Sequence, residues 1–374
     1  MPSDGDRSEP LTAAVAAASE TGRSLTIVGS GSKSGTPNGS ETVSTAGHEG
    51  VVDYRPDELV VVARAGSHLN DIESVLADSG QALPFEPPLF GGRGTLGGAV
   101  ATGLAGPGRP WFGSARDALL GVTIVNGMGQ RLSFGGQVLK NVAGYDVSSL
   151  MAGAFGTLGL LLDVSLRVRP LPETSLTLAR ECTPDTAHRL ISDLLRKPLP
   201  VTATAYCGGV LRIRLSGSHE AASHAAAGLD LDLEVEDDLF FQGVRDHTHP
   251  FFSGFHGSTP PSTGGTSTLS HASEAGADSP AEGSGRLWML SLPLGSVFDE
   301  ANTLTEWASA RIWWRTDADA DTVRARARVA GGYAASFPPR LADVAPAVRK
   351  YMGRLKAAFD PAGILNTKLL SHAD

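Results

Sequence analysis

The chain has 374 residues, which is long for one average domain and fits two, on a prior of roughly 150 residues each. A net charge of −9 argues against nucleic-acid binding, because phosphate recognition needs clustered Lys and Arg. No apolar run approaches the roughly 20 residues that span a bilayer, and the acidic start MPSDGDRSEP differs from a targeting peptide, so we expect a cytoplasmic protein.

The first part of the chain alternates between helix and strand patterns. Ser8 is a candidate N-cap for a helix through LTAAVAAASET, which Gly22 would end. A second helix is expected over 69–80, where apolar residues recur on one face. Strands are expected within 24–29, 51–66, 119–134 and 160–170, the third of these as a hairpin around Asn126–Gly127.

A second pattern of helices and strands begins after residue 171. Helices are expected at 183–197, 218–228, 322–332 and 345–359. Strands are expected within 203–217, 286–293 and 311–315. This alternation predicts an antiparallel sheet with helices on one face, which is an α+β architecture.

The composition changes abruptly between residues 247 and 285. This segment is rich in Ser, Thr, Gly and Pro and predicts a mobile surface insertion. It contains His247, His249, His256 and His271, whose irregular spacing favours no metal site. We therefore expect no bound metal.

The two cysteines, Cys182 and Cys207, share no CxxC spacing. They cannot hold an iron–sulfur cluster, which usually needs four thiolates. They are also unlike a zinc or redox motif. If electrons leave this protein for a cluster, that cluster belongs to another chain.

Glycine-rich segments predict a site for a pyrophosphate. Its two negative charges favour backbone N–H groups that no side chain obstructs. The segment 27–35 follows a strand, and taken alone it is equally typical of a plain Gly/Ser turn. The segment 91–129 gives a stronger signal, because its glycines alternate with apolar residues, unlike a flexible loop. The segment 140–168 adds a third glycine turn at GTLG.

These motifs resemble a known flavoprotein family. TLGG, GSARDALLG, KNVAGYD and GTLG are similar to the PCMH-type FAD-binding domain of the vanillyl-alcohol-oxidase superfamily. LPFEPPLFG, GPGRPWFGSARD and FGGQVLKNVAGYD, with the tail FDPAGILN, resemble the FAD-binding E subunits of bacterial glycolate oxidase (glycolate dehydrogenase). The resemblance is close from about residue 25 to 170 and resumes near the C-terminus.

The resemblance implies a domain organisation. Residues 1–170 would form the FAD-binding domain from two α/β subdomains, and 171–335 a smaller antiparallel cap domain containing the 247–285 insertion. Residues 336–374 would return to the FAD domain as a helix and tail. The FAD would be non-covalent, because the first glycine loop lacks the histidine that often carries the flavin, although His68 is an alternative.

The resemblance also assigns cofactor residues by position. The pyrophosphate would contact the first glycine loop, and the adenine end would contact the third. The full set is Gly29, Ser30, Gly31, Ser32, Lys33, Gly94, Thr95, Leu96, Gly97, Gly98, Ala101, Thr102, Gly103, Ser114, Asp117, Gly156, Gly159 and Leu160.

The resemblance implies a subunit that oxidises glycolate to glyoxylate together with a second FAD-linked subunit and an iron–sulfur subunit, at the inner membrane through the complex. Oxidising a 2-hydroxy acid needs a base, a cation for the carboxylate and a flavin. No His/Arg/His cluster is visible, so the catalytic residues stay open, with Arg315, Tyr145 and Tyr333 as candidates. The alternatives are a stand-alone FAD oxidase or dehydrogenase of another small 2-hydroxy acid or alcohol, and a non-catalytic assembly subunit.

Overall fold

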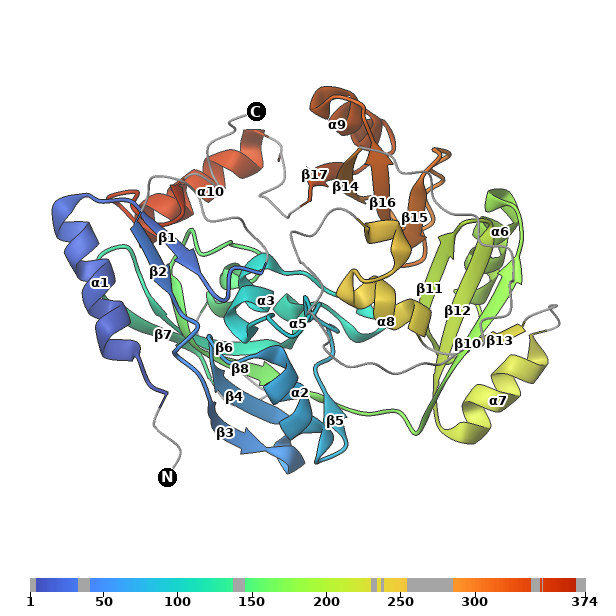
Figure 1. Cartoon of the computed structure of the whole chain (residues 1–374), viewed down its shortest axis with the longest axis horizontal. Coiled ribbons are helices and arrows are strands. Elements are labelled where there is room, and N and C mark those ends of the chain that lie inside the picture. Colours follow the sequence, from blue (N-terminus) through green and yellow to red (C-terminus); the bar gives the residue numbers. More distant parts are fainter. Residues whose placement is uncertain are drawn as a thin grey trace, which may run out of the picture.

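The computed structural model describes residues 5–32, 41–136, 145–229, 234–236, 239–253, 285–337, 344 and 346–367. Within these residues the chain forms two large antiparallel sheets, which occupy the two sides of the view in Figure 1. One belongs to the N-terminal half and the other to the C-terminal half. This mixture of helices and antiparallel sheets confirms the predicted α+β fold.

The N-terminal half is built on a sheet with the strand order β3-β4-β8-β6-β7. A separate parallel pair joins β1 and β2. The strands are β1 (Leu25–Val28), β2 (Glu41–Ser44), β3 (Val51–Arg55), β4 (Val60–Arg64), β5 (Gln81–Ala82), β6 (Leu119–Val125), β7 (Arg131–Gly135), β8 (Leu160–Arg167) and β9 (Arg169–Pro170). The helices are α1 (Ser8–Thr21), α2 (Leu69–Ala77), α3 (Leu96–Thr102), α4 (Arg109–Phe112) and α5 (Ala115–Ala118).

Helix α2 follows its sequence pattern. Leu69, Ile72 and Leu76 are at most 1% exposed and join the core that contains Val61 of β4 and Val164 of β8. Each such buried side chain stabilises the fold by about 1.5–3 kcal/mol. The apolar stripe of α2 therefore fixes the helix against the sheet.

The C-terminal half is built on a sheet with the strand order β13-β10-β12-β11-β15-β16-β14-β17. The strands are β10 (Thr174–Glu181), β11 (Val201–Cys207), β12 (Val210–Gly217), β13 (Glu234–Glu236), β14 (Arg286–Ser291), β15 (Thr303–Glu306), β16 (Arg311–Thr316) and β17 (Tyr333–Ser336). The helices are α6 (Pro184–Leu194), α7 (His219–Gly228), α8 (Leu239–Asp246) and α9 (Ala320–Val329). We call this half the cap.

Side chains alternate between the two faces of the cap sheet. Ile312 and Trp314 of β16 pack with α9, on the face that also receives α6 and α7. Trp313, between them, packs on the opposite face with Phe241 of α8. The cap sheet is thus covered on both faces, whereas the sequence predicts helices on one face and leaves α8 unpredicted.

The start of the expected insertion is packed in the cap core. His247 is 6% exposed, and its ring stacks on Phe252 at a centroid distance of 4.7 Å. Phe251 is also buried. The polar composition after residue 253 obscures this aromatic cluster in the sequence, and residues 254–284 of the expected insertion, with His256 and His271, lie outside the described residues.

The C-terminal helix α10 (Pro346–Phe359) leads into a tail that returns to the first half, where Leu365 forms a parallel bridge with Leu25 of β1. Figure 1 shows α10 beside the N-terminal elements, opposite β17. None of the described helices has the length and apolarity needed to cross a bilayer.

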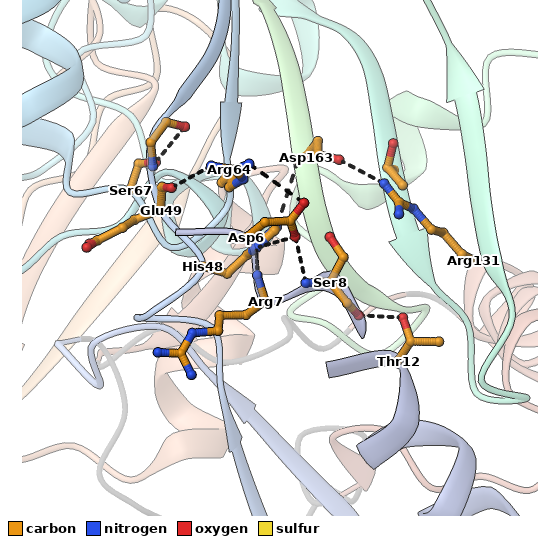
Figure 2. A network of polar contacts seen from close by, with 12 residues as sticks. Asp6, Arg7, Ser8, Thr12, His48, Glu49, Arg64, Ser67, Arg131 and Asp163 are labelled. Atoms are coloured by element: carbon orange, nitrogen blue, oxygen red, sulfur yellow. Dashed lines mark hydrogen bonds and ion pairs between the residues drawn. The ribbon is translucent and has the colours of Figure 1, made fainter. Parts of the chain in front are cut away.

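A polar network ties the N-terminus to the sheet (Figure 2). The Ser8 cap is wrong: α1 begins at Ser8 itself, and the Asp6 carboxylate accepts the Ser8 N–H at 2.8 Å. Asp6 also lies 3.7 Å from Nδ1 of His48, which accepts the Arg7 N–H at 3.0 Å. Since its Nδ1 accepts this bond, the fully buried His48 is neutral in the folded chain.

Several charged groups surround His48. Asp163 of β8 lies 3.8 Å from its Nε2, and Arg64 at the end of β4 lies 3.7 Å from Asp6. Burial lowers the pKa of His48 from its usual value of 6.5, although the two carboxylates oppose this shift.

We expect the free energy of unfolding to decrease as the pH falls below 6.5, because His48 takes up a proton more readily in the unfolded chain. Above that pH the residue is neutral in both states and adds no pH dependence. His48→Asn retains an acceptor for Arg7 and does not titrate, so it should reduce the slope by up to about 1.4 kcal/mol per pH unit. Urea unfolding at pH 7.5 and 5.5 measures both slopes, and equal slopes would contradict the prediction.

Candidate functional site

A cavity opens where β1, α3 and the C-terminal tail meet. The space between its walls, counted together with the open solvent at its mouth, is about 780 Å³. The residues that line it are Ile27, Val28, Gly29, Ser30, Gly31, Ser32, Thr45, Ala65, Thr95, Gly97, Gly98, Ala101, Thr102, Phe155, Gly156, Gly159, Leu161 and Asn366.

The loop after β1 forms one wall of the cavity. A Cβ atom at Gly29 would lie 2.4 Å from Oγ1 of Thr95, so only glycine allows the loop to approach α3 this closely. Gly31 has a φ of 72°, in the left-handed region that glycine favours. The Ser30 hydroxyl donates to the carbonyl of Arg93, which joins the loop to the opposite wall.

Helix α3 forms the facing wall, and its two glycines have different environments. Thr95 caps the helix, since its hydroxyl accepts the Gly98 N–H at 3.2 Å. Gly97 is buried, and a Cβ there would lie 2.6 Å from Cβ of Ala65, so this glycine serves packing on β4 as well as the cavity. Gly98 is half-buried and is thus the more open of the two.

Asn366 closes the third side and connects distant parts of the chain. Its Oδ1 accepts the Ile27 N–H at 2.7 Å, and its Nδ2 donates to the Phe155 carbonyl at 2.6 Å. Gly156 has a φ of 68°, and a Cβ there would lie 2.8 Å from Asn366 Nδ2. The tail therefore sets the distance between β1 and the glycine turn before β8.

The lining suits an anionic, partly aromatic ligand. Among the described residues that line the cavity none is charged, and the polar groups are backbone amides, the side-chain amide of Asn366 and the hydroxyls of Ser30, Ser32, Thr45, Thr95 and Thr102. Neutral donors of this kind stabilise a phosphate without a competing acidic group. Apolar side chains between them offer surface for rings.

The structure brings together eleven of the residues that the sequence assigned to the cofactor. These are Gly29, Ser30, Gly31, Ser32, Thr95, Gly97, Gly98, Ala101, Thr102, Gly156 and Gly159. Seven further lining residues were not in the assigned set, and only the FDPAGILN tail motif pointed toward Asn366. These seven are Ile27, Val28, Thr45, Ala65, Phe155, Leu161 and Asn366. Lys33 lies outside the described residues.

Six other assigned residues do not line this cavity and have structural roles instead. Leu96 and Leu160 are 0% exposed and belong to the core. A Cβ at Gly94 would lie 2.9 Å from Cδ1 of Leu69, and Gly103 ends α3 with a φ of 64°. The remaining two, Ser114 and Asp117, form the capping box of α5.

The three catalytic candidates lie away from the cavity lining. Arg315 donates to the carbonyls of Phe251 and Ser253, each at 3.3 Å. Tyr145 is 95% exposed and Tyr333 is 49% exposed. None of the three lines the cavity with the residues above.

Metal and thiolate chemistry find no support in the described residues. No three His, Cys, Asp or Glu side chains converge there on a point that could hold an ion. Burial raises the pKa of the Cys207 thiol to about 11 and also raises that of Cys182, so both stay protonated near neutral pH.

Comparison with known proteins identifies the cofactor of this chain. A family described as FAD binding domain matches residues 6–135. The chain is 39% identical to the glycolate oxidase subunit GlcE of Escherichia coli over 91% of each chain. FAD is therefore the cofactor.

Another relative matches a shorter part of the chain, and a solved structure matches most of it. The glycolate oxidase subunit GlcD of Bacillus subtilis is 29% identical over 41% of this chain and 33% of its own length. A solved structure of alkyldihydroxyacetonephosphate synthase covers 96% of the chain with a TM-score of 0.63 at 12% identity, so it shares the fold. The chain belongs to the family of FAD-dependent oxidoreductases that includes the glycolate oxidase subunit GlcE.

Proposed function

We propose that this chain is the FAD-binding subunit of a glycolate oxidase (glycolate dehydrogenase) complex that converts glycolate to glyoxylate. The observation that carries the proposal is the 39% identity to GlcE over 91% of both chains, which includes both halves of the fold. The cavity between β1, α3 and the tail supports it with a lining fit for a dinucleotide.

The proposal assigns the pyrophosphate to the neutral donors of the cavity. The loop Gly29 to Ser32 would donate from one wall and α3, at Gly98, would lie close from the other. Among the described lining residues there is no His, Cys or Tyr that could attach the flavin, which supports a non-covalent FAD. When bound, FAD supplies the acceptor for the hydride of the 2-hydroxy acid.

The proposal includes partner chains. Two separate cysteines cannot provide the four thiolates of an iron–sulfur cluster, so the electrons would leave through an iron–sulfur subunit. The similarity to both GlcE and GlcD supports a second FAD-linked subunit. We place the complex in the cytoplasm at the inner membrane, with this chain attached through its partners.

Glycolate-dependent dye reduction tests the assignment to a complex. We expect the complex purified with its partners to reduce the dye, and the isolated chain to reduce it at least about 100-fold more slowly, because no catalytic candidate lines the cavity. Equal rates would contradict the proposal and indicate a stand-alone enzyme. A complex that stays fully active after removal of the flavin site from this chain would indicate an assembly subunit.

A further inference from the structure

The chain segment that follows α3 is held by side chains from distant elements. This segment, residues 103–108, directly continues the α3 wall of the cavity. The indole Nε1 of Trp307 donates to the Gly106 carbonyl at 2.8 Å, and Nη1 of Arg311 donates to the Ala105 carbonyl at 2.8 Å. The carboxylate of Glu86 accepts the Gly108 N–H at 2.7 Å.

The 103–108 loop packs closely against Glu86. A Cβ at Gly106 would lie 2.6 Å from the carbonyl oxygen of Glu86, and one at Gly108 would lie 2.9 Å from the Glu86 carboxyl carbon. Glu86 is itself bonded to Arg214 of β12 at 2.6 Å. The loop is therefore enclosed between Glu86 on one side and the cap on the other.

The cap residues that hold the loop come from a strained turn. The turn between β15 and β16 contains Trp307, Ala308 and Ser309, with φ angles of 55°, 51° and 69°. Three consecutive non-glycine residues in the left-handed region are costly, and such strain persists only where the surroundings enforce it. Here the Ala308 N–H donates to the Thr204 hydroxyl of β11 at 3.0 Å.

A buried ion pair fixes the same turn. Glu306 and Arg311 flank it, are 2% and 4% exposed, and lie 3.4 Å apart. Trp313 donates to the same Glu306 oxygen at 2.7 Å, and the Arg311 guanidinium carbon lies 3.2 Å from the centre of the Trp307 ring. Because a buried charge cannot leave its partner without a large desolvation penalty, neither side chain is free to move.

We propose that Trp307 and Arg311 are positioning residues: from the cap, they hold the 103–108 loop and through it the α3 wall against the flavin. The flavin part of this inference rests on the proposed FAD site. The strained turn then has a function, since it presents an indole N–H and a guanidinium to two consecutive carbonyls. FAD affinity and the flavin reduction potential would depend on a turn about 200 residues from α3 in the sequence.

Amide hydrogen exchange of the full chain, measured in the absence of FAD, tests whether Trp307 and Arg311 hold the 103–108 loop. Trp307→Phe retains an aromatic ring and loses the hydrogen bond to the Gly106 carbonyl. In the original chain the Gly106 amide donates to the Phe85 carbonyl, and in the variant this amide should exchange with solvent about tenfold faster. Trp314→Phe is the matched control, because Trp314 lies on the other face of the cap sheet and packs against Phe298. Unchanged exchange at Gly106 in Trp307→Phe, or equal acceleration in both variants, overturns the proposal.

The same two variants test the coupling to the flavin. We expect Trp307→Phe to bind FAD about tenfold more weakly and to shift its reduction potential, and Trp314→Phe to match the original chain in both. An altered potential separates positioning from a general loss of stability. Unaltered affinity and potential in Trp307→Phe refute the coupling. An original chain that binds no FAD refutes the proposed function, and hydrogen exchange at Gly106 then decides whether the cap holds the loop.

Arg311→Lys provides a second variant for the case that Trp307→Phe does not fold. Lysine keeps a positive charge beside Glu306 and lacks the planar fork of donors that reaches Ala105. The amide of Gly106 should again exchange faster than in Trp314→Phe. Protection equal to that of the control overturns the proposal here too.

Discussion

Gly98→Val should raise the dissociation constant for FAD by at least about 100-fold, which corresponds to about 2.7 kcal/mol. Gly98 is half-buried in the α3 wall, opposite the loop that follows β1. A branched side chain there would fill the cavity and keep the pyrophosphate from the helix backbone. Helix α3 itself should tolerate the change, because valine has a higher helix propensity than glycine.

Gly353→Val is the matched control for this prediction. Gly353 also lies within a helix, α10, and a Cβ there would meet no atom within 4 Å. We expect this variant to bind FAD like the original chain in a fluorescence titration. If Gly98→Val bound FAD as tightly as the original chain does, the cofactor would have to lie away from α3, which would contradict the proposed site.

Asp360→Ala should lower the free energy of unfolding by about 3–5 kcal/mol, because it leaves the half-buried Lys356 ammonium without its partner and two buried N–H groups without their acceptor. Asp360 is 1% exposed and pairs with Lys356, whose ammonium also donates to the carbonyls of Thr157 at 2.8 Å and Leu365 at 2.7 Å. The same carboxylate accepts the N–H groups of Ile364 and Leu365. It thus shapes the tail that carries Asn366 to the cavity.

Asp321→Ala tests whether this loss of stability is specific to the Lys356–Asp360 pair. The Asp321 side chain is 94% exposed and lies 3.5 Å from Arg324 on the surface of α9. Removing it should change stability by no more than about 0.5 kcal/mol. Urea unfolding of both variants measures the difference, and equal midpoints would show that the Lys356–Asp360 pair does not hold the tail.

The sequence predicts the glycine segments that line the cavity but does not separate their glycines by role. Gly98 lines the cavity, whereas Gly94, Gly106 and Gly108 are glycines because Leu69 or Glu86 approaches the backbone. A ligand and a packed residue can each require a glycine, so the two situations leave the same mark in the sequence. Only the folded chain shows which neighbour, a ligand or a packed residue, requires each one.

Some elements carry too little local signal to be predicted. Helix α3 contains Gly97 and Gly98, and glycine is the weakest helix former after proline. It forms because Leu96 and Val100 are fully buried and Thr95 supplies the cap. The edge strand β17 has four residues, and its adjacent Ala334 and Ala335 are both buried, so the strand shows no alternation of apolar and polar residues.

Contacts between residues far apart in the chain also could not be predicted from the sequence. Asn366 bonds to Ile27 across 339 residues, and Trp307 bonds to Gly106 across 201. No local pattern encodes such pairs. The positions of the catalytic candidates depend on such contacts too, and Arg315, Tyr145 and Tyr333 lie outside the cavity lining.

The visible absorbance of the purified chain, followed by acid precipitation, tests the cofactor site most directly. We expect a flavin spectrum before precipitation and about one FAD per chain in the supernatant afterwards, because no lining residue among those described could attach it. A colourless chain that takes up no added FAD would contradict the cofactor site, and flavin retained in the pellet would contradict non-covalent binding.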